Sequence, residues 1–258
     1  MYQYDLARSW DIESAKLVGS INIFPQESSP QAVFFKDDGT KMYITGVSGD
    51  DVNEYNLSTA WDVTTATYDS AFSVSSQETS PFGLFFKDDG TKMYVGGTTS
   101  NAVNEYNLST AWDVSTATYS QNFSVSAKTT LFRGVSFKTD GTKMYVLGGA
   151  TDGEIYEYSL STAWDVSTST FSQELSVLGL ESAAEDIFFK DDGEKMYILG
   201  NASNAVYEYH LTTPYTLSLP ASVENGPTQP VAYEDRVTYE FFTADSGTTV
   251  TLIGETIL

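Results

Sequence analysis

The chain contains no cysteine and only one histidine among its 258 residues. Without a thiol there is no disulfide framework, no thiolate metal site and no cysteine nucleophile. With His210 alone, pairs of a nucleophile and an imidazole base and histidine-based metal sites are nearly excluded. A run of 18 apolar residues is also missing, so we expect no membrane-spanning helix. We expect no cofactor and no resident metal.

Basic residues are few as well: 13 Lys and Arg stand against 35 Asp and Glu, a net charge of −22. A surface of this sign repels nucleic acid and anionic membranes, so neither a nucleic-acid partner nor membrane insertion is expected. The first ten residues are neither basic nor apolar enough for a signal peptide. Solubility alone is the simpler explanation of the charge.

Two motifs recur along the chain. The first has its central glycine at intervals of 51, 51 and 52 residues, and it reads KDDGTKMY at 36–43 and 87–94, KTDGTKMY at 138–145 and KDDGEKMY at 190–197. The second occurs five times, as VNEYNLSTAWDV at 52–63 and 103–114, IYEYSLSTAWDV at 155–166, and weaker copies at 2–12 and 206–217. Residues 241–254, FFTADSGTTVTLIG, provide a divergent fifth copy of the first motif, with Gly247 in the place of the central glycine.

Each repeat predicts four short strands, because aromatic and β-branched residues dominate, helical periodicity is absent and the Asp-Gly pair suits a tight hairpin turn. Four-stranded repeats of this length are typical of propeller blades. We therefore predict an all-β fold, a five-bladed β-propeller in one domain over residues 1–258. Residues 2–24 and 238–258 would share one blade in a "velcro" closure that leaves no open sheet edge. The other four blades would cover about 33–74, 84–125, 135–177 and 187–223.

A four-unit propeller followed by a separate C-terminal module from about Pro220 is the competing fold. Residues 221–235 do read as a linker, with two prolines and a glycine. However, Leu211 and Phe242 are 31 residues apart, close to the 29 residues of the equivalent gap in the other four copies. This spacing favours the closed ring.

One aromatic position recurs in every copy, as Trp10, Trp61, Trp112, Trp164 and Tyr215. A ring of aromatics for stacking sugars is one interpretation, but we favour packing between neighbouring blades. The aspartate that follows each tryptophan is expected to accept backbone N–H bonds. Paired acids such as Asp37 and Asp38 lack the spaced ligands of a calcium loop, so a solvated hairpin tip is predicted there and no metal site.

The repeats differ mainly on one face of the predicted disc. The turns of the first motif and the loops around each tryptophan are nearly identical copies, whereas the connections of the opposite face vary. Arg and aromatic residues dominate binding hot spots, so this variable face is predicted to bind a partner. Greater tolerance of loops to change is the competing explanation. The predicted binding residues are Gln31, Phe82, Phe132, Arg133, Glu185 and Asp186.

Glu185 and Asp186 are the only acids that look unusual against the repeat. Glycoside hydrolysis needs two carboxylates that act on one substrate, whereas adjacent residues of a strand point in opposite directions. We therefore predict that the chain is not an enzyme, with a carbohydrate-active enzyme as a lesser alternative.

The pattern F-K-x-D-G-x-K-M-Y resembles the strand pair F-S-P-D-G-x-x-x-Y-V of YVTN/lactonase-like propeller repeats. This resemblance implies the fold and not the activity, because the metal-binding carboxylates and histidine of the lactonases have no counterpart that can be placed here. The phrase VNEYNLSTAWDVSTATYSQNFSVS at 103–126 resembles repeat proteins of marine bacteriophages and uncultured marine viruses. The segment from 219 to 255 is similar to C-terminal segments of phage tail-fibre-type proteins.

The viral resemblance implies a non-enzymatic virion structural protein, an accessory or decorating component of a capsid or tail. Such a protein would lie on the surface of the virion and bind other virion proteins. The alternative is a receptor- or glycan-binding module of a tail fibre, similar to a lectin, whose partner would be a host cell-surface glycan or receptor.

Overall fold

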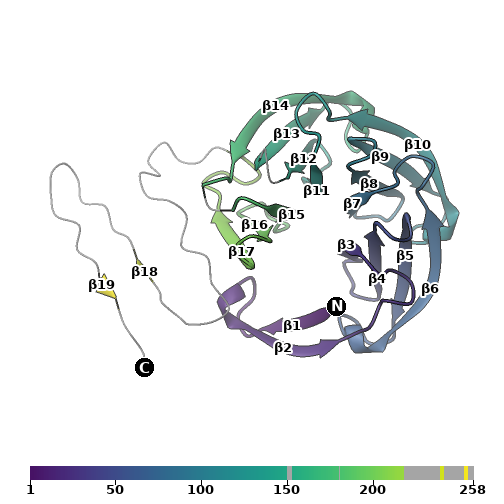
Figure 1. Cartoon of the computed structure of the whole chain (residues 1–258), viewed down its shortest axis with the longest axis horizontal. Helices are drawn as coiled ribbons and strands as arrows, with labels where there is room; N and C mark the ends of the chain where they lie inside the picture. The colour runs from purple at the N-terminus through teal and green to yellow at the C-terminus, as the bar shows by residue number, and fades with distance from the viewer. Residues whose placement is uncertain (150–152, 180, 218–238, 241–252, 255–258) are drawn as a thin grey trace.

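The structure, a computed structural model, describes residues 1–149, 153–179, 181–217, 239–240 and 253–254. The chain forms antiparallel sheets arranged around a central axis (Figure 1). In each blade the first strand lies next to the axis and the last lies at the rim. The all-β propeller is therefore confirmed.

Three blades have four strands each. Blade 1 contains β3 (Pro30–Phe35), β4 (Lys41–Gly46), β5 (Asp51–Leu57) and β6 (Ala66–Ser73). Blade 2 contains β7 (Pro81–Phe86), β8 (Lys92–Gly97), β9 (Ala102–Leu108) and β10 (Ala117–Ser124). Blade 3 contains β11 (Phe132–Phe137), β12 (Lys143–Gly148), β13 (Glu154–Leu160) and β14 (Ser169–Ser176). A short 3-10 turn precedes each rim strand: η2 (Val63–Thr65), η3 (Val114–Thr116) and η4 (Val166–Thr168).

Blade 4 has three described strands, β15 (Ala184–Phe189), β16 (Lys195–Gly200) and β17 (Ala205–His210). The N-terminal hairpin consists of β1 (Tyr2–Leu6), η1 (Ile12–Ser14) and β2 (Ala15–Ser20), and it lies in the ring between blade 4 and blade 1 (Figure 1). The remaining strands, β18 (Tyr239–Glu240) and β19 (Ile253–Gly254), pair only with each other in the described part of the chain.

The prediction of five complete blades is corrected by this topology: the structure shows four blades. Among the described strands, the fifth position of the ring holds the β1–β2 hairpin alone, which corresponds to the two outer strands of a blade. No described strand pairs with the inner edge of β1. Most of the predicted closing segment, 238–258, lies outside the described residues, so the closure itself is not confirmed. The alternative of a separate module from about Pro220 falls on that same region.

Each Asp-Gly turn supports an aromatic ring from the same blade, a tryptophan in blades 1 to 3 and Tyr215 in blade 4. In blade 2, Gly90 has φ +70°, and a Cβ there would overlap the ring of Trp112. The Trp112 N–H donates to the Gly90 carbonyl at 3.0 Å, and Trp112 itself has φ 65°, a left-handed conformation that is uncommon for a bulky residue. Asp113 then accepts from the backbone N–H of Ser115 at 3.0 Å, as predicted. These contacts place the turn and the tryptophan loop on one face.

A tyrosine hydroxyl joins each blade to the next unit of the ring. The bonds run to backbone carbonyls, from Tyr43 to Trp112 (2.7 Å), from Tyr94 to Trp164 (2.8 Å), from Tyr145 to Tyr215 (2.5 Å) and from Tyr197 to Trp10 (3.0 Å). Burial raises the pKa of the Tyr43 phenol, so the hydroxyl remains a donor. The bond from Tyr197 to Trp10 shows that the N-terminal hairpin contacts blade 4 in the same way that each blade contacts the blade before it.

The hairpin also contacts blade 1 in the way that the blades contact one another. The Gln3 side-chain oxygen accepts from the Val63 N–H at 2.8 Å, and Glu54 of blade 1 accepts from the Val114 N–H of blade 2 at 2.9 Å. The ring therefore has five positions, of which four are blades. Packing between blades is confirmed for Trp112 and Trp164, because each stacks against a tyrosine of the preceding blade and is 8% exposed.

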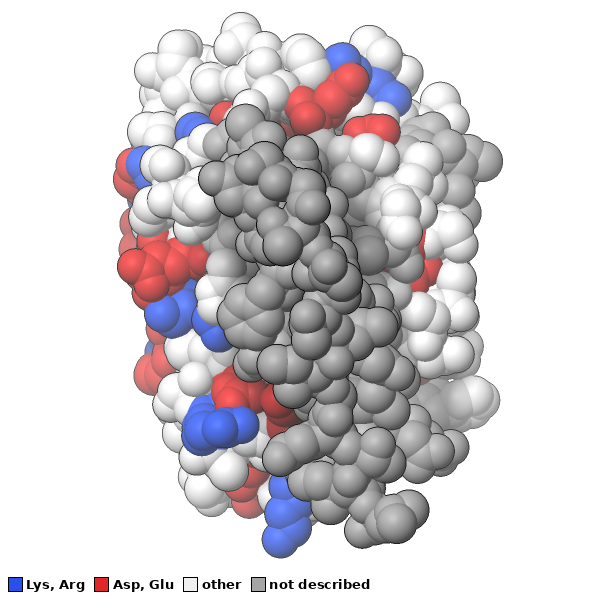
Figure 2. All heavy atoms as spheres, turned by 90° about the vertical axis from the view of Figure 1, so that its left-hand side faces the viewer, with Lys and Arg blue, Asp and Glu red and all other residues white. Residues whose placement is uncertain are grey.

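Buried glutamates organise the opposite face. Glu78 is fully buried, and its carboxylate accepts from the backbone N–H groups of Ser80 (2.7 Å), Thr99 (3.1 Å) and Ser100 (2.9 Å). Glu27 and Glu181 hold the corresponding loops of blades 1 and 4. At the surface, acidic and basic side chains lie close together on the side shown in Figure 2.

We expect Gly90→Ala to lower the free energy of unfolding by about 2 to 5 kcal/mol, because the new Cβ would require a left-handed backbone and would displace the Trp112 ring. Urea denaturation followed by tryptophan fluorescence measures the change. Gly179→Ala is the control, since nothing lies within 4 Å of the Cβ it would add. Equal stability of the two variants would show that the turn does not need glycine.

Tyr94→Phe should destabilise the fold by about 1 to 3 kcal/mol, because it removes the buried donor to the Trp164 carbonyl of the next blade. Tyr119→Phe, at a side chain that is 43% exposed, should change the free energy of unfolding by less than about 0.5 kcal/mol. Thermal unfolding of both variants compares them. A matching loss in both would argue against the hydrogen bond as the link between blades.

Candidate functional site

The innermost strand of every blade begins with a β-bulge. The register against the second strand shifts between Pro30 and Ala32 in β3, and at the equivalent positions of β7, β11 and β15. A bulge leaves one residue unpaired and redirects its side chain. The four bulged residues are Gln31, Phe82, Arg133 and Glu185, four of the residues that the repeat comparison selected.

Three of these side chains from three blades meet at one place. The Arg133 guanidinium carbon lies 4.4 Å from the centre of the Phe82 ring, and Arg133 Nε lies 3.1 Å from Glu185 Oε2. The Arg133 and Glu185 side chains are 19% and 28% exposed, so the pair is partly desolvated but reachable from solvent. The arrangement combines a cation–π contact with an ion pair.

Two of the predicted binding residues lie outside this cluster. The Gln31 amide nitrogen is 3.5 Å from the Ser29 carbonyl of its own blade. Phe132 is fully buried and packs into the core of blades 2 and 3, where a Cβ at Gly96 would meet its ring. Phe132 therefore supports the inner strand and is not available to a partner at the surface.

Asp186 follows the bulge of β15. Its carboxylate accepts from the Ile187 N–H at 2.8 Å and lies against Gly134 of β11, where an added Cβ would come within 2.6 Å of Oδ1. Burial raises the pKa of Asp186 to about 7, and the hydrogen bond from Ile187 only partly opposes this. The raised pKa lets this carboxyl group keep its proton to a higher pH than an ordinary aspartate, so it can act as a proton donor.

Glu185 and Asp186 both reach the inner strand of blade 3. Both carboxylates contact β11 of blade 3: Glu185 pairs with Arg133, and Asp186 packs against Gly134. The strict alternation of a strand fails here because the register shifts between Ala184 and Asp186. The sequence carries no marker of this bulge beyond the variability of its residue.

Carboxylates also approach one another at the turns of the other face. Burial, then the charge of Asp191, raises the pKa of Asp37, and burial together with Asp37 and Asp191 raises the pKa of Asp88. Across the described ranges, no three His, Cys, Asp or Glu side chains are grouped in a way that could hold a metal ion. Nor does any helix in those ranges have the length and apolar character needed to cross a membrane.

Because the folded protein holds the Asp186 proton up to about pH 7, the free energy of unfolding should fall as pH rises from about 4 to 7. This group contributes up to about 4 kcal/mol to that fall. Asp186→Asn removes the contribution, so the stability difference between the variant and the wild type should grow with pH. Urea titrations at several pH values measure it, with the exposed Asp69→Asn as control. Parallel pH curves for wild type and Asp186→Asn would contradict the raised pKa.

No protein-family model matches the sequence, and no curated protein matches it. Among solved structures, a candidate 6-phosphogluconolactonase from Bacteroides uniformis is similar with a TM-score of 0.55 and 14% identity over 88% of this chain and 65% of that one. A second, from Bacteroides fragilis, has a TM-score of 0.55 and 13% identity over 89% of this chain and 65% of that one. The periplasmic gluconolactonase of Pseudomonas aeruginosa has a TM-score of 0.52 and 15% identity over 79% and 54%. The chain thus spans less than two thirds of the length of each, and the likeness shows the propeller fold.

These similarities correct the expected function. Propellers similar to this chain are named as lactonases, whereas the virion, capsid and tail-fibre assignments find no support. The expectation of a non-enzymatic phage structural protein is therefore contradicted, as is the expectation that the chain is not an enzyme. The structure confirms a repeat-built propeller but does not indicate a marine phage or YVTN-type repeats in particular. Repeats define how a blade packs, and many activities use the same blade.

Proposed function

We propose that this chain is a propeller hydrolase that opens lactones at the cluster of Phe82, Arg133, Glu185 and Asp186, called the bulge site below. The observation that carries the proposal is the pairing of the Arg133 guanidinium with the Glu185 carboxylate beside the Phe82 ring, at the start of the inner strands of blades 2 to 4, with the Asp186 carboxyl group against the neighbouring Gly134. The names of the similar propellers give it further support.

The bulge site contains the groups that lactone hydrolysis needs. Water adds to the carbonyl carbon, negative charge develops on the carbonyl oxygen, and the ring C–O bond then breaks to release a hydroxyl and a carboxylate. Arg133 is placed to stabilise the oxyanion, and Glu185 to take a proton from the attacking water. Asp186, with its pKa of about 7, would give a proton to the departing ring oxygen. Phe82 would provide an apolar surface for the face of the ring.

An uncharged lactone fits this site better than a phosphorylated one. The positive charge of Arg133 is already balanced by Glu185 at 3.1 Å. The chain as a whole has a net charge of −22, which repels an anionic substrate on approach. Gluconolactone should therefore be a better substrate than its 6-phosphate.

The direct test is hydrolysis of gluconolactone followed by base consumption at constant pH, with the spontaneous rate subtracted. Glu185→Gln and Arg133→Met should each lower kcat/KM by about 100-fold, because each removes a group that acts on the transition state. Lys128→Met is a matched control: Lys128 also lies over an aromatic ring, 3.5 Å from the centre of Phe171, and pairs with Glu174 at 3.0 Å.

The control variant should retain the wild-type rate because Lys128 contacts β14 at the rim. A wild-type rate equal to that of buffer would reject the hydrolase proposal. Loss of activity in the Lys128 variant to the same extent would reject the bulge site as its location.

We further propose that residues 238–258 complete the fifth position as two inner strands, which makes the ring five-bladed. Two contacts support this arrangement. Trp10 accepts from Tyr197 of blade 4, and Gln3 accepts from Val63 of blade 1, so the hairpin already makes the contacts of a blade on both sides. The β18–β19 pair is antiparallel, as are the first two strands of every blade.

A further inference from the structure

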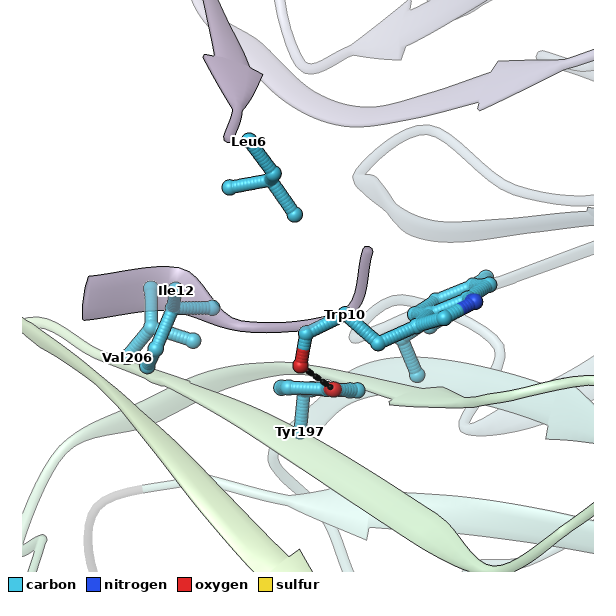
Figure 3. A pocket seen from close by; sticks show the side chains of 6 residues that line it. Leu6, Trp10, Ile12, Tyr197 and Val206 are labelled. Carbon is cyan, nitrogen blue, oxygen red and sulfur yellow. Dashed lines mark hydrogen bonds between the residues drawn. The ribbon is translucent and has the colours of Figure 1, made fainter. Parts of the chain in front are cut away.

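An apolar pocket lies between blade 4 and the N-terminal hairpin. It has a volume of about 230 Å³, and six side chains line it: Leu6, Trp10, Ile12, Phe188, Tyr197 and Val206. Figure 3 shows the Trp10 carbonyl bonded to the Tyr197 hydroxyl below the pocket, with Leu6 above and Ile12 beside Val206. Leu6 and Phe188 are 40% and 44% exposed, although both carry large apolar groups.

In blades 2 and 3, the equivalent tryptophan packs against two phenylalanine rings, one from the preceding blade and one from its own inner strand. Trp112 packs against Phe34 of the preceding blade at 6.4 Å between ring centres and against Phe86 of its own inner strand at 5.7 Å. Trp164 likewise packs against Phe137 of its own inner strand at 5.5 Å. Trp10 has its partner from the preceding blade, Phe188 at 6.1 Å, but no described ring from an inner strand of its own.

Trp61, on the other side of the hairpin, lacks the opposite contact: a described aromatic ring from the preceding position of the propeller. It packs against Phe35 of its own inner strand at 5.5 Å, but no described aromatic ring reaches it from the preceding position. It is 50% exposed, whereas Trp112 and Trp164 are each 8% exposed. Trp10 and Trp61 therefore flank the same place in the ring, where the described residues provide no pair of inner strands.

We infer that the pocket is the docking site of Phe242 and that Phe241 covers Trp61. In the repeat, the first phenylalanine of the FFKDDG motif packs on the tryptophan of the next blade, as Phe34 does on Trp112. The second phenylalanine packs on the tryptophan of its own blade, as Phe86 does on Trp112. The sequence FFTADSG at 241–247 contains both phenylalanines. This inference rests on the five-bladed ring proposed above and is independent of lactone hydrolysis.

The described strands of the C-terminal segment are antiparallel, as are the first two strands of a blade. Glu240 pairs with Ile253, whereas the repeat alignment would pair Glu240 with Leu252, so the register of β18–β19 differs by one residue from that of β3–β4. Phe242 follows Leu217 by 25 residues, enough to reach about 80 Å when extended, so the length of the chain does not prevent docking. The lining offers one hydroxyl, which Trp10 already engages, and this suits an aromatic ring better than a polar ligand.

Because the chain has no cysteine, an engineered disulfide tests the occupant directly. Lys41 is opposite Asn56 in blade 1, and the repeat places Thr249 and Asp5 at these positions in the fifth unit. The double variant Asp5→Cys, Thr249→Cys should form an intramolecular disulfide, seen as a faster-migrating monomer on a non-reducing gel. Asp5→Cys with Val250→Cys is the matched control, because a shift of one residue turns the side chain to the other face.

A disulfide-linked dimer would overturn the inference by showing that a second copy of the chain occupies the site. Absence of the crosslink, or equal crosslinking of the control, would overturn it as well. A second readout avoids dependence on the new cysteines. Phe242→Ala should lower Tm by about 10 °C and increase acrylamide quenching of tryptophan, whereas Phe171→Ala, at an exposed rim position, should do neither. Unchanged Tm and quenching in Phe242→Ala would also contradict the docking.

Discussion

The hydrogen bond from a buried tyrosine to the backbone of the next unit is the constraint on which the ring depends. Tyr43, Tyr94 and Tyr145 are fully buried, so an unpaired hydroxyl at any of them would be costly. The accepting carbonyl belongs to the residue with a left-handed backbone, and that backbone is held by a glycine beneath its ring. One motif of glycine, tyrosine and tryptophan therefore determines both the shape of a blade and its attachment to its neighbour.

This constraint explains why the two faces of the disc differ. On the tryptophan face, nearly every repeated residue contacts another repeated residue, so a change in one disturbs a whole set of contacts. On the opposite face a buried glutamate such as Glu78 holds the loop through backbone N–H groups, and the bulged residues beside it have no repeated partner. Side chains there are free to differ among blades, and the guanidinium and carboxylates of the bulge site lie on this face.

The charged residues also differ between the two faces of the disc. Lys92 pairs with the buried Glu105, whose second oxygen accepts from the Val166 N–H of the next blade, so this pair stabilises the ring and is not available for chemistry. Turn aspartates such as Asp38 accept from Lys36 and Thr40, which lowers the pKa of Asp38 to about 2 and keeps it ionised. Asp186 has only a backbone donor in a desolvated place, so its pKa moves in the opposite direction.

The sequence by itself determined the blade, the repeat, the packing role of Trp112 and Trp164 and the four variable positions, because these depend on contacts within one repeat or between adjacent copies. It did not reveal the bulge, since the extra residue is visible only in the pairing of β15 with β16. Only the structure shows where these two acids reach, Glu185 to Arg133 and Asp186 to Gly134 of blade 3. The tertiary structure decided which variable side chains meet, that Phe132 is buried, and that the hairpin lies between blade 4 and blade 1. Each of these depends on contacts between different blades and not on residues that are neighbours in the chain.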